Sequence, residues 1–171
     1  MFDLDQIPQI ETERLVLRGI EERDFENFAA MFADAEFAHF LGGIWGRERC
    51  WGSIAWTLGH WRMRGYGMFA VDDKASGAYI GRIGPIWRPD VIEIEIGWQI
   101  ARPFWNRGLA TEGARAARDW TFATLRFEKV VHYIDPANPA SIRVAEKLGA
   151  HYARDLAYEG GTARVYESIA R

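Results

Sequence analysis

The residues best suited to chemistry lie in one stretch, EIGWQIARPFWNRGLATE, at positions 95–112. An alternating segment runs into a short loop that contains Asn106, Arg107 and Gly108, and a helical pattern follows. The first turn of a helix has free N–H groups and a partial positive charge, which favour phosphate binding. Because Gly108 and Ala110 are small, an anion can approach the backbone there, and the joint predicts a phosphate-binding site.

This stretch lacks the signatures of two other phosphate-binding loops. It has no G-K-[ST], as a Walker A loop would, and no G-x-G-x-x-G, as a dinucleotide-binding fingerprint would. An ordinary strand–loop–helix joint, with a small residue for packing, stays open as the alternative interpretation.

The elements that must position this joint follow from hydrophobic periodicity. Seven strands are expected, at 13–20, 67–72, 78–87, 91–100, 129–135, 151–158 and 162–169. Four helices are expected: one beginning at an Asp24 cap, one between Arg47 and Gly65, one at 108–125, and one between Asn138 and Gly149. The order β-α-α-β-β-β-α-β-α-β-β predicts a mixed α/β or α+β sandwich, with helices packed on one sheet.

Local signals mark the boundaries of several of these elements. Asn138 and Pro139 suit the N-cap and the first position of the last helix. Turns are expected at the sequence DKASG, at Arg88-Pro89-Asp90 and at Glu159-Gly160-Gly161.

Composition and charge exclude several classes of function. The chain has 171 residues, of which 49% are hydrophobic and 26% charged, so we expect one folded domain over residues 1–171. The net charge of -3 gives no electrostatic basis for binding nucleic acid or an anionic membrane. The acidic start MFDLDQIPQI has no secretory pattern, and no apolar run approaches the ~20 residues of a membrane span. We therefore expect a cytoplasmic protein.

The cysteine and histidine residues predict neither a disulfide nor a metal site. Cys50 is the one cysteine, so no intrachain disulfide can form. The four histidines show no zinc-ligand spacing, and no metal is expected; they are His39, His60, His132 and His151.

The loop of the chemistry-bearing stretch resembles a known motif. It is similar to [QR]-x-x-G-x-[GA], the pyrophosphate-binding motif of the GCN5-related N-acetyltransferase (GNAT) superfamily; Gly108 and Ala110 match, and Trp105 occupies the first position. The run FWNRGLATE resembles the RimJ/RimL-like branch, which acetylates protein N-termini. Further segments resemble that branch in the family's order, so the likeness covers about residues 11–168; they are 65–71, 80–84, 93–98 and 138–150.

The resemblance implies a fold and a co-substrate. The fold is a GNAT-like, mostly antiparallel sheet of about seven strands, flanked by four helices and splayed between the strands at 91–100 and 129–135. The co-substrate is acetyl-coenzyme A (acetyl-CoA), whose pantetheine arm would enter the splay. The resemblance implies that pantetheine contacts the side chain of Asn138 and the backbone of Trp98, Gln99 and Ile100. It implies that the pyrophosphate contacts the backbone of Asn106, Arg107, Gly108, Leu109, Ala110 and Thr111. Ser141 would lie near the thioester sulfur.

The resemblance also implies acetyl transfer to a primary amine. Cys50, the only possible thiol nucleophile, lies outside the motif with no aligned His partner, so we expect direct attack in a ternary complex without an acyl intermediate. An α-amine has a pKa of ~7.7–8.0, so its deprotonation needs only a carboxylate acting through water. Glu95, and after it Glu93, are the candidate bases, because they share a face of the strand at 91–100. A solvated or salt-bridged strand face stays open as the alternative.

Two further roles follow from the same resemblance. A backbone N–H near Trp98 would stabilise the oxyanion. Many relatives protonate the leaving thiolate with a Tyr of the last helix. Ala145 stands at that position here, so the role passes to Ser141 or to water.

The identity of the acceptor is the least specific part of the sequence. A protein or peptide N-terminal amine is the leading expectation. A small amine (aminoglycoside, polyamine or amino acid) and a non-catalytic acyl-CoA-binding module stay open, as does a homodimer. The resemblance places the acceptor between residues 34–66 and 156–164, with Phe40 and Trp45 as candidate contacts.

Overall fold

The strands of the computed structural model form one sheet. The structure describes residues 1, 3–89, 91–158 and 161–170; Asp90, Glu159 and Gly160, expected in turns, lie outside these ranges. In the described residues the sheet has eight strands in the order β1-β2-β3-β4-β5-β6-β8-β7. The strands are β1 (Ile10–Glu11), β2 (Leu15–Arg18), β3 (Phe69–Asp73), β4 (Ala78–Ile86), β5 (Glu95–Ile100), β6 (Lys129–Ile134), β7 (His151–Tyr158) and β8 (Gly161–Ile169).

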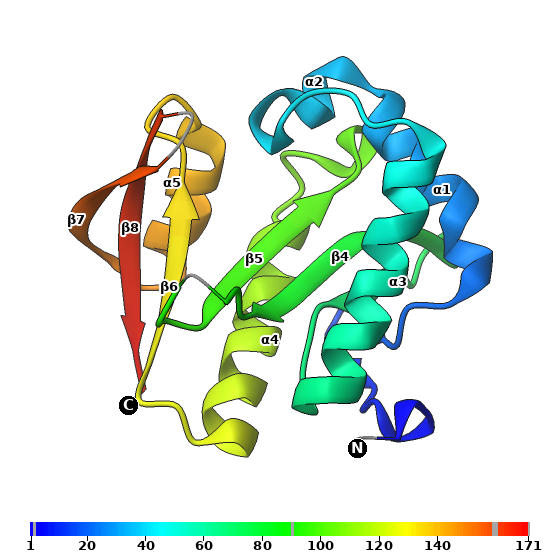
Figure 1. The fold of residues 1–171 in the computed structure, drawn as a ribbon, viewed down its shortest axis with the longest axis horizontal. Coiled ribbons are helices and arrows are strands. Elements are labelled where there is room, and N and C mark those ends of the chain that lie inside the picture. The colour runs from blue at the N-terminus through cyan, green and yellow to red at the C-terminus, as the bar shows by residue number, and fades with distance from the viewer. Residues whose placement is uncertain (2, 90, 159–160, 171) are drawn as a thin grey trace.

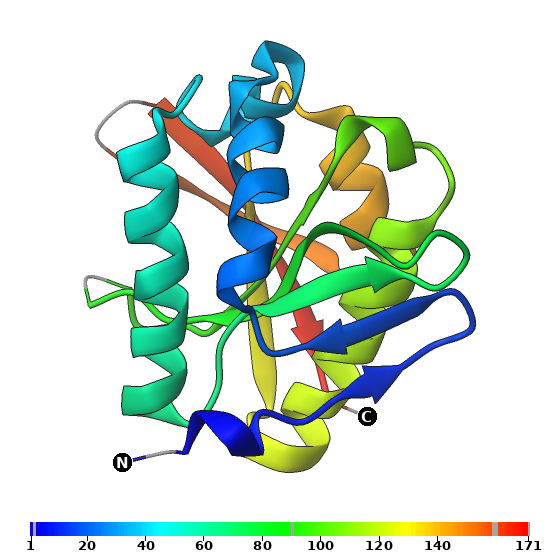
Figure 2. The same cartoon turned by 90° about the vertical axis from the view of Figure 1, so that its right-hand side faces the viewer.

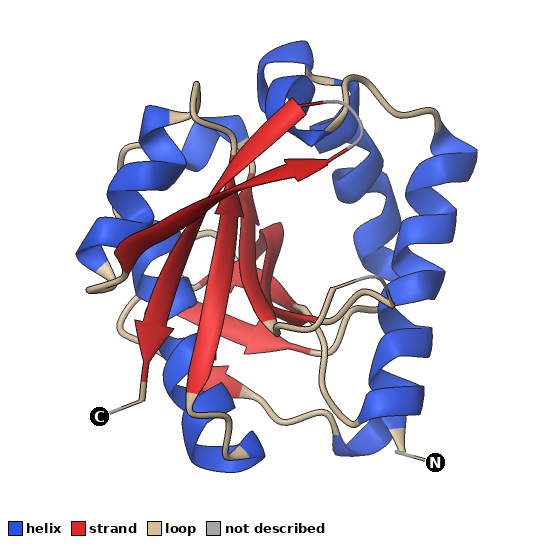
Figure 3. Ribbon diagram, turned by 60° about the vertical axis from the view of Figure 1, so that its left-hand side comes forward, coloured by secondary structure: helices blue, strands red, loops and turns tan. Residues whose placement is uncertain are grey.

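Helices cover both faces of this sheet. The α-helices are α1 (Phe25–Ala33), α2 (Ala35–Ala38), α3 (Arg47–Arg64), α4 (Leu109–Leu125) and α5 (Pro139–Lys147). Short 3-10 helices are η1 (Leu4–Gln6), η2 (Glu22–Asp24), η3 (His39–Leu41) and η4 (Arg102–Phe104). Figure 2 shows α1 and α3 on one face of the sheet and α4 and α5 on the other, and Figure 3 shows the strands enclosed between these helical layers.

This architecture confirms the predicted α/β class and corrects the count of elements. The described residues hold eight strands rather than seven, and five α-helices rather than four. The added strand, β1, is only two residues long, so it carries no alternation for a sequence pattern to detect. The added helix, α2, is a single turn capped by Asp34, whose Oδ1 accepts the N–H of Glu36 at 3.0 Å.

The first part of the predicted strand at 91–100 is wrong. The strand β5 begins at Glu95, which pairs with Ile86 at the end of β4. Ile92, expected on the buried face, is 96% exposed. The alternating sequence continues upstream of Glu95, but β4 has already ended and offers no partner there. Burial and pairing, rather than alternation, therefore set the start of this strand.

The predicted helix cap at Asp24 is also replaced by a different contact. The side chain of Asp24 makes no capping bond to α1. It is buried and accepts hydrogen bonds from both terminal nitrogens of Arg18, at 2.7 and 2.8 Å. A buried carboxylate is better compensated by a guanidinium than by one N–H, and this ion pair ties the entry of α1 to β2.

The sheet is divided where β5 meets β6. Strands β1 to β5 pair antiparallel in sequence order, and β6, β8 and β7 form a second antiparallel group. Between the groups β5 and β6 run parallel, and the described pairing is limited to Glu95 with Val131. Figure 1 shows β5 and β6 diverging from this point. The predicted splay between these two strands is confirmed.

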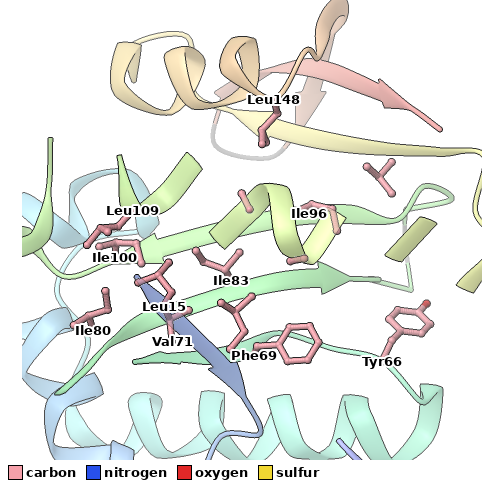
Figure 4. Packing of buried hydrophobic residues seen from close by; sticks show 14 of the residues in the cluster. Leu15, Tyr66, Phe69, Val71, Ile80, Ile83, Ile96, Ile100, Leu109 and Leu148 are labelled. Atoms are coloured by element: carbon pink, nitrogen blue, oxygen red, sulfur yellow. The ribbon is translucent and has the colours of Figure 1, made fainter. Parts of the chain in front are cut away.

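Small residues let α4 lie close against the undivided part of the sheet. Gly113, Ala114 and Ala117 are buried on its inner face, and a Cβ added at Gly113 would lie 2.7 Å from Cδ1 of Ile83. Larger side chains of the strands fill the space around them, as Figure 4 shows for Ile83, Ile96 and their neighbours. This packing fixes the position of α4, and with it the start of the helix.

A glycine of β4 tests how tightly β4 and β5 are packed. Gly81 has φ +153°, and a Cβ there would lie 2.0 Å from the carbonyl oxygen of Gln99. Gly81→Ala should therefore lower the free energy of unfolding by about 1–3 kcal/mol, measured by urea denaturation. In the matched control, Gly52 lies in α3 with open space around it, so Gly52→Ala should raise that free energy by up to about 1 kcal/mol. Equal stabilities for both variants would contradict this view of the strand pair.

Candidate functional site

A cleft of about 1130 Å³ lies where β5 and β6 diverge. One wall is β5, the opposite wall is β6 with α5, and α2, η3 and the start of α4 border its ends. Most residues singled out from the sequence line it: Glu95, Trp98, Gln99, Ile100, Asn106, Gly108, Leu109, Ala110, Thr111, Asn138 and Ser141. Glu93 and Arg107 do not belong to its lining.

The edge of β5 that faces the cleft is only partly hydrogen-bonded. The carbonyl oxygens of Ile94, Ile96 and Ile100 accept bonds from Val131 N, His132 Nδ1 and Trp105 Nε1, at 2.9, 2.9 and 2.6 Å. Strand alternation then directs the backbone N–H and C=O of Trp98 toward the same edge. This position lies beyond the last described pairing with β6, so Trp98 offers a donor and an acceptor to the cleft.

The neighbouring residue, Gln99, is oriented the other way. Its carbonyl oxygen lies toward Gly81 of β4, where an added Cβ would meet it. Its side chain accepts a hydrogen bond from Nε of Arg82 at 2.7 Å. Arg82 is buried and also donates to Ser53 and Thr57 of α3. The amide of Gln99 is thereby held in place on the α3 side of the sheet.

His132 supplies a side-chain bond at the point where backbone pairing stops. It is 1% exposed, with Nδ1 2.9 Å from the carbonyl of Ile96 and Nε2 3.1 Å from Oγ of Ser168. A carbonyl can only accept, so Nδ1 carries the proton and Nε2 accepts from the hydroxyl. Burial lowers the pKa of His132 to about 4, against the backbone bond to Ile96, which raises it. The ring is therefore neutral and holds β5 at a fixed distance from β6.

The start of α4 presents backbone N–H groups to the cleft. Asn106 and Gly108 both have left-handed backbone conformations, with φ of 60° and 79°. The first helical bond joins the N–H of Glu112 to the carbonyl of Gly108, so the three preceding N–H groups, at residues 109–111, have no intrahelical acceptor. These donors and the helix dipole favour an anion at this end of the cleft.

Three residues without a predicted role in the site support this turn. Glu112 accepts hydrogen bonds from Thr12 Oγ1 at 2.6 Å and from Arg14 Nε at 2.7 Å. Arg14 also donates through Nη1 to the carbonyl of Arg107 at 2.8 Å, so the loop is attached to the N-terminal end of β2. Glu112 belongs to the quoted loop motif, but about a hundred positions separate it from its partners, and no local pattern reveals such a pairing.

The opposite wall begins with the N-terminus of α5. As predicted, Asn138 is the N-cap, and its Oδ1 accepts the N–H of Ser141 at 3.0 Å. The Ser141 hydroxyl in turn accepts a bond from Trp98 Nε1 at 3.3 Å, which links α5 to β5 across the cleft. Ala145 is fully buried and packs with Ile134, so it contributes no polar group.

Glu95 projects from β5 on the face opposite to Ile96 and α4. Its side chain is 12% exposed and forms an ion pair with Nη1 of Arg88. Burial raises the pKa of Glu95, and the Arg88 guanidinium opposes that shift. Oε1 of Glu95 lies over Gly97, 3.7 Å from the position of an added Cβ. The carboxylate therefore faces the strand segment that leads to Trp98.

Glu93 occupies a different environment. It accepts hydrogen bonds from the Tyr133 hydroxyl at 3.0 Å and from Nη2 of Arg154 at 2.5 Å. Burial would raise the pKa of Glu93, but the bonds from Arg154 and Tyr133 outweigh it and lower that pKa. Glu93 thus precedes the strand, does not share a strand face with Glu95, and is engaged in an ion pair that attaches the segment before β5 to β7.

Of the two aromatic residues predicted to contact the substrate, one lines the cleft and the other does not. Phe40, in η3, lines the cleft and is 38% exposed. Trp45 does not line it: its ring stacks on Phe32 with centroids 3.8 Å apart, and its Nε1 donates to the carbonyl of Leu41. Trp45 therefore belongs to the packing between α1 and α3.

The cysteine and the histidines form no reactive or metal-binding group in the described part of the chain. Cys50 is fully buried and burial raises the pKa of its thiol. No cluster of His, Cys, Asp and Glu suited to a metal ion occurs among the residues searched. The described helices also include none with the length and apolar character needed to cross a bilayer.

Comparisons with known proteins agree on one family. Residues 14–151 match the family model described as an acetyltransferase (GNAT) domain. The uncharacterized protein YkkB of Bacillus subtilis is 34% identical over 161 residues, which cover 91% of this chain and 92% of YkkB. The crystal structure of an acetyltransferase from Agrobacterium tumefaciens is 32% identical, with a TM-score of 0.88 and 96% of each chain covered.

More distant structures share the fold and differ in what they acetylate. One is RimL, a ribosomal L7/L12 α-N-protein acetyltransferase in complex with coenzyme A, at 16% identity, a TM-score of 0.78 and coverage of 95% of this chain and 98% of RimL. Another is spermidine N-acetyltransferase from Vibrio cholerae in complex with CoA and spermine, at 17% identity, a TM-score of 0.76 and coverage of 92% and 96%. At these identities the likeness concerns the fold alone.

The buried His132 makes stability depend on pH in a defined window. Its folded pKa of about 4 lies below the ordinary value of 6.5, so between these values the unfolded chain binds a proton that the folded chain does not. His132 should therefore cost up to about 3 kcal/mol of stability as the pH falls from 6.5 to 4. Urea unfolding of His132→Asn should show a flatter pH profile over this window. His151→Gln, at an exposed position, should keep the wild-type slope; equal slopes for His132→Asn and wild type would contradict the assignment.

Proposed function

Because this chain belongs to the GNAT family of acetyl-CoA-dependent acetyltransferases, we propose that the cleft between β5 and β6 is where it transfers acetyl to a primary amine. The observation that carries this proposal is the meeting, in one cleft, of two kinds of backbone group for which the described residues provide no partner. The free edge of β5 at Trp98 suits the amides of a pantetheine arm, and the N–H groups at residues 109–111 suit a pyrophosphate.

Several of the residues present fit the coenzyme, whereas the backbone of Gln99 faces β4 and the carbonyl of Ile100 is already bonded to Trp105, so these two expected contacts are not available. Gly108, at φ 79°, carries no side chain where the phosphates would lie, and its neighbours Leu109 and Ala110 present their N–H groups. Asn138 and Ser141 border the stretch of cleft that the pantetheine arm would cross, and Ser141 is already hydrogen-bonded to Trp98. When bound, acetyl-CoA would supply the activated acetyl group.

Glu95 is the residue that we assign as general base. Burial raises its pKa, the ion pair with Arg88 favours the carboxylate, and in that form it can take a proton from an acceptor ammonium directly or through water. The neutral amine then attacks the thioester carbon, a C–N bond forms and the C–S bond breaks. The nitrogen loses its second proton to water, which balances the proton gained by the leaving thiolate. The N–H of Trp98 would donate to the developing oxyanion.

The last helix has no tyrosine at the position of Ala145 to protonate the leaving thiolate. Ala145 is buried and apolar, so the Ser141 hydroxyl or water at the same end of the cleft would supply that proton. The buried Cys50 takes no part, which makes transfer direct rather than through an acyl-enzyme. Turnover with any amine would distinguish this proposal from a binding module without activity.

Two kinds of acceptor are consistent with this chemistry. A peptide N-terminus and a small amine would both place an ammonium against Glu95. The family includes enzymes named for each, as RimL and the spermidine acetyltransferase show, so the family alone does not select between them.

The first test concerns the coenzyme site. Gly108→Glu adds a side chain and a negative charge where the pyrophosphate would lie, so calorimetry should show a loss of acetyl-CoA affinity of ten-fold or more. Gly108→Asn tolerates the same left-handed backbone without the charge and should lose much less. Unchanged affinity in a folded Gly108→Glu protein would overturn this placement of the coenzyme.

The second test concerns the base. Glu95→Gln keeps the shape of the side chain and removes its proton acceptor, so kcat should fall by about 10²–10⁴-fold while acetyl-CoA binding is retained. The defect should shrink at high pH, where the amine is already neutral. Wild-type activity should fall as the pH drops through the raised pKa of Glu95, because the protonated acid cannot act as a base.

Two variants control this experiment. Cys50→Ala should keep nearly full turnover, since the thiol lies outside the cleft. Glu93→Gln should alter stability rather than show the pH-dependent defect. If Glu93→Gln shows that defect and Glu95→Gln does not, the base is Glu93 and the assignment is wrong.

A further inference from the structure

A cationic group, Arg88, faces the cleft beside the carboxylate assigned as base. Arg88 belongs to the segment between β4 and β5, is 51% exposed, and lines the cleft together with Glu95. Its Nη1 donates to Oε2 of Glu95. The site therefore presents one negative and one positive group side by side to whatever amine enters.

Both members of this pair keep hydrogen-bonding capacity within the described structure. Oε1 of Glu95 accepts no bond from a described residue, and Nε and Nη2 of Arg88 donate none. A carboxylate oxygen can receive an ammonium, and the free side of a guanidinium can receive a second carboxylate in a two-point contact. The pair is thus complementary to a molecule that carries an ammonium and a carboxylate a short distance apart.

Each of the other carboxylates that border the cleft already has a described partner. Glu36 lies 3.4 Å from Arg102, which also binds Asp34 at 2.6 Å. Asp135, at the other wall, accepts the N–H of Ala137 at 2.8 Å. A polyamine needs further anionic groups for its other ammonium ions, and Arg88 would repel them.

The remaining walls on this side of the cleft are mainly apolar. Apolar residues come from α2, η3, the residue before β3, β4 and β7, with Glu36 and His39 as polar neighbours; they are Phe37, Phe40, Leu41, Met68, Ile86 and Leu156. Such walls favour a hydrophobic group on the acceptor, because its burial is favourable and no polar partner is needed.

Resting on the proposed function, we propose that the acceptor is a free α-amino acid with an apolar side chain. Its ammonium would bind Oε1 of Glu95, its α-carboxylate would bind the free side of Arg88, and its side chain would lie against the apolar walls. A peptide N-terminus has an amide in place of the α-carboxylate, so it would leave the Arg88 contact unmade. Arg88 is in this view the residue that determines specificity.

The test compares two acceptors that differ in this one group, L-leucine and L-leucinamide. With the full-length protein and acetyl-CoA, kcat/KM for leucine should exceed that for leucinamide by about 10- to 100-fold, the size of one charge-assisted two-point contact. The amine of leucinamide loses its proton more readily than the amine of leucine. Without the Arg88 contact, leucinamide should therefore be the better acceptor, so a preference for leucine is a strict test.

Arg88→Gln should abolish this preference, because it should lower kcat/KM for leucine about 10- to 100-fold more than kcat/KM for leucinamide. The loss of Arg88 also alters Glu95, but that effect acts on both acceptors and cancels in their ratio. Arg64→Gln is the matched control: Arg64 stacks on Trp87, next to Arg88 in sequence, and does not line the cleft. Its variant should keep the wild-type preference.

Several results would overturn the inference. Equal turnover of leucine and leucinamide, a preference for spermidine, or an unchanged ratio in Arg88→Gln would each do so. No turnover of leucine by a protein that still binds acetyl-CoA would also overturn it, and would leave the coenzyme site intact. Loss of the coenzyme assignment itself would show in the Gly108→Glu calorimetry, so the two failures are distinguishable.

Discussion

The structure depends on how backbone hydrogen bonds are satisfied where one strand loses its neighbour. A strand in the middle of a sheet normally pairs on both sides, and an unpaired buried N–H or C=O is costly. Here β6 turns away from β5 after one described pair, Glu95 with Val131. The resulting edge is interior to the molecule and partly open, and the cleft, the bound side chains around it and the proposed coenzyme contacts all follow from that divergence.

Side chains take over the bonds that β6 would have made. The ring of His132 donates to the carbonyl of Ile96, and Trp105, in the loop before α4, donates to the carbonyl of Ile100. Each contact has a second use, because His132 fixes the distance between the two halves of the sheet and Trp105 fixes the loop whose next residues begin α4. Trp98 is the position left between them, so the same arrangement that limits the cost of the open edge also defines where a ligand can complete it.

The local conformation was predictable from the sequence wherever one short segment determines it. The Asn138 cap and the strand–loop–helix joint at Gly108 are of this kind, since the cap and the glycine act on neighbouring residues. The errors arose where strand pairing sets the structure. The alternation from Ile92 onward could not show that β4 had already ended, so the predicted strand began too early and Glu93 was placed on the same strand face as Glu95. The contacts of Glu112 with Arg14, and of Arg88 with Glu95, join separate elements and leave no periodic signal.

The pairing of Glu95 with Val131, the one described pair between β5 and β6, also marks the point about which the two halves of the sheet would turn. If the halves rotate about this pair as a ligand enters or leaves, displacement grows with distance along the strands. The helix ends at Gly108 and Asn138 would travel furthest, whereas the carboxylate of Glu95 stays almost fixed. Such a rotation would change the width of the cleft entrance and leave the Glu95 carboxylate in place. The opening of the cleft and the alignment of this carboxylate would then be independent of each other.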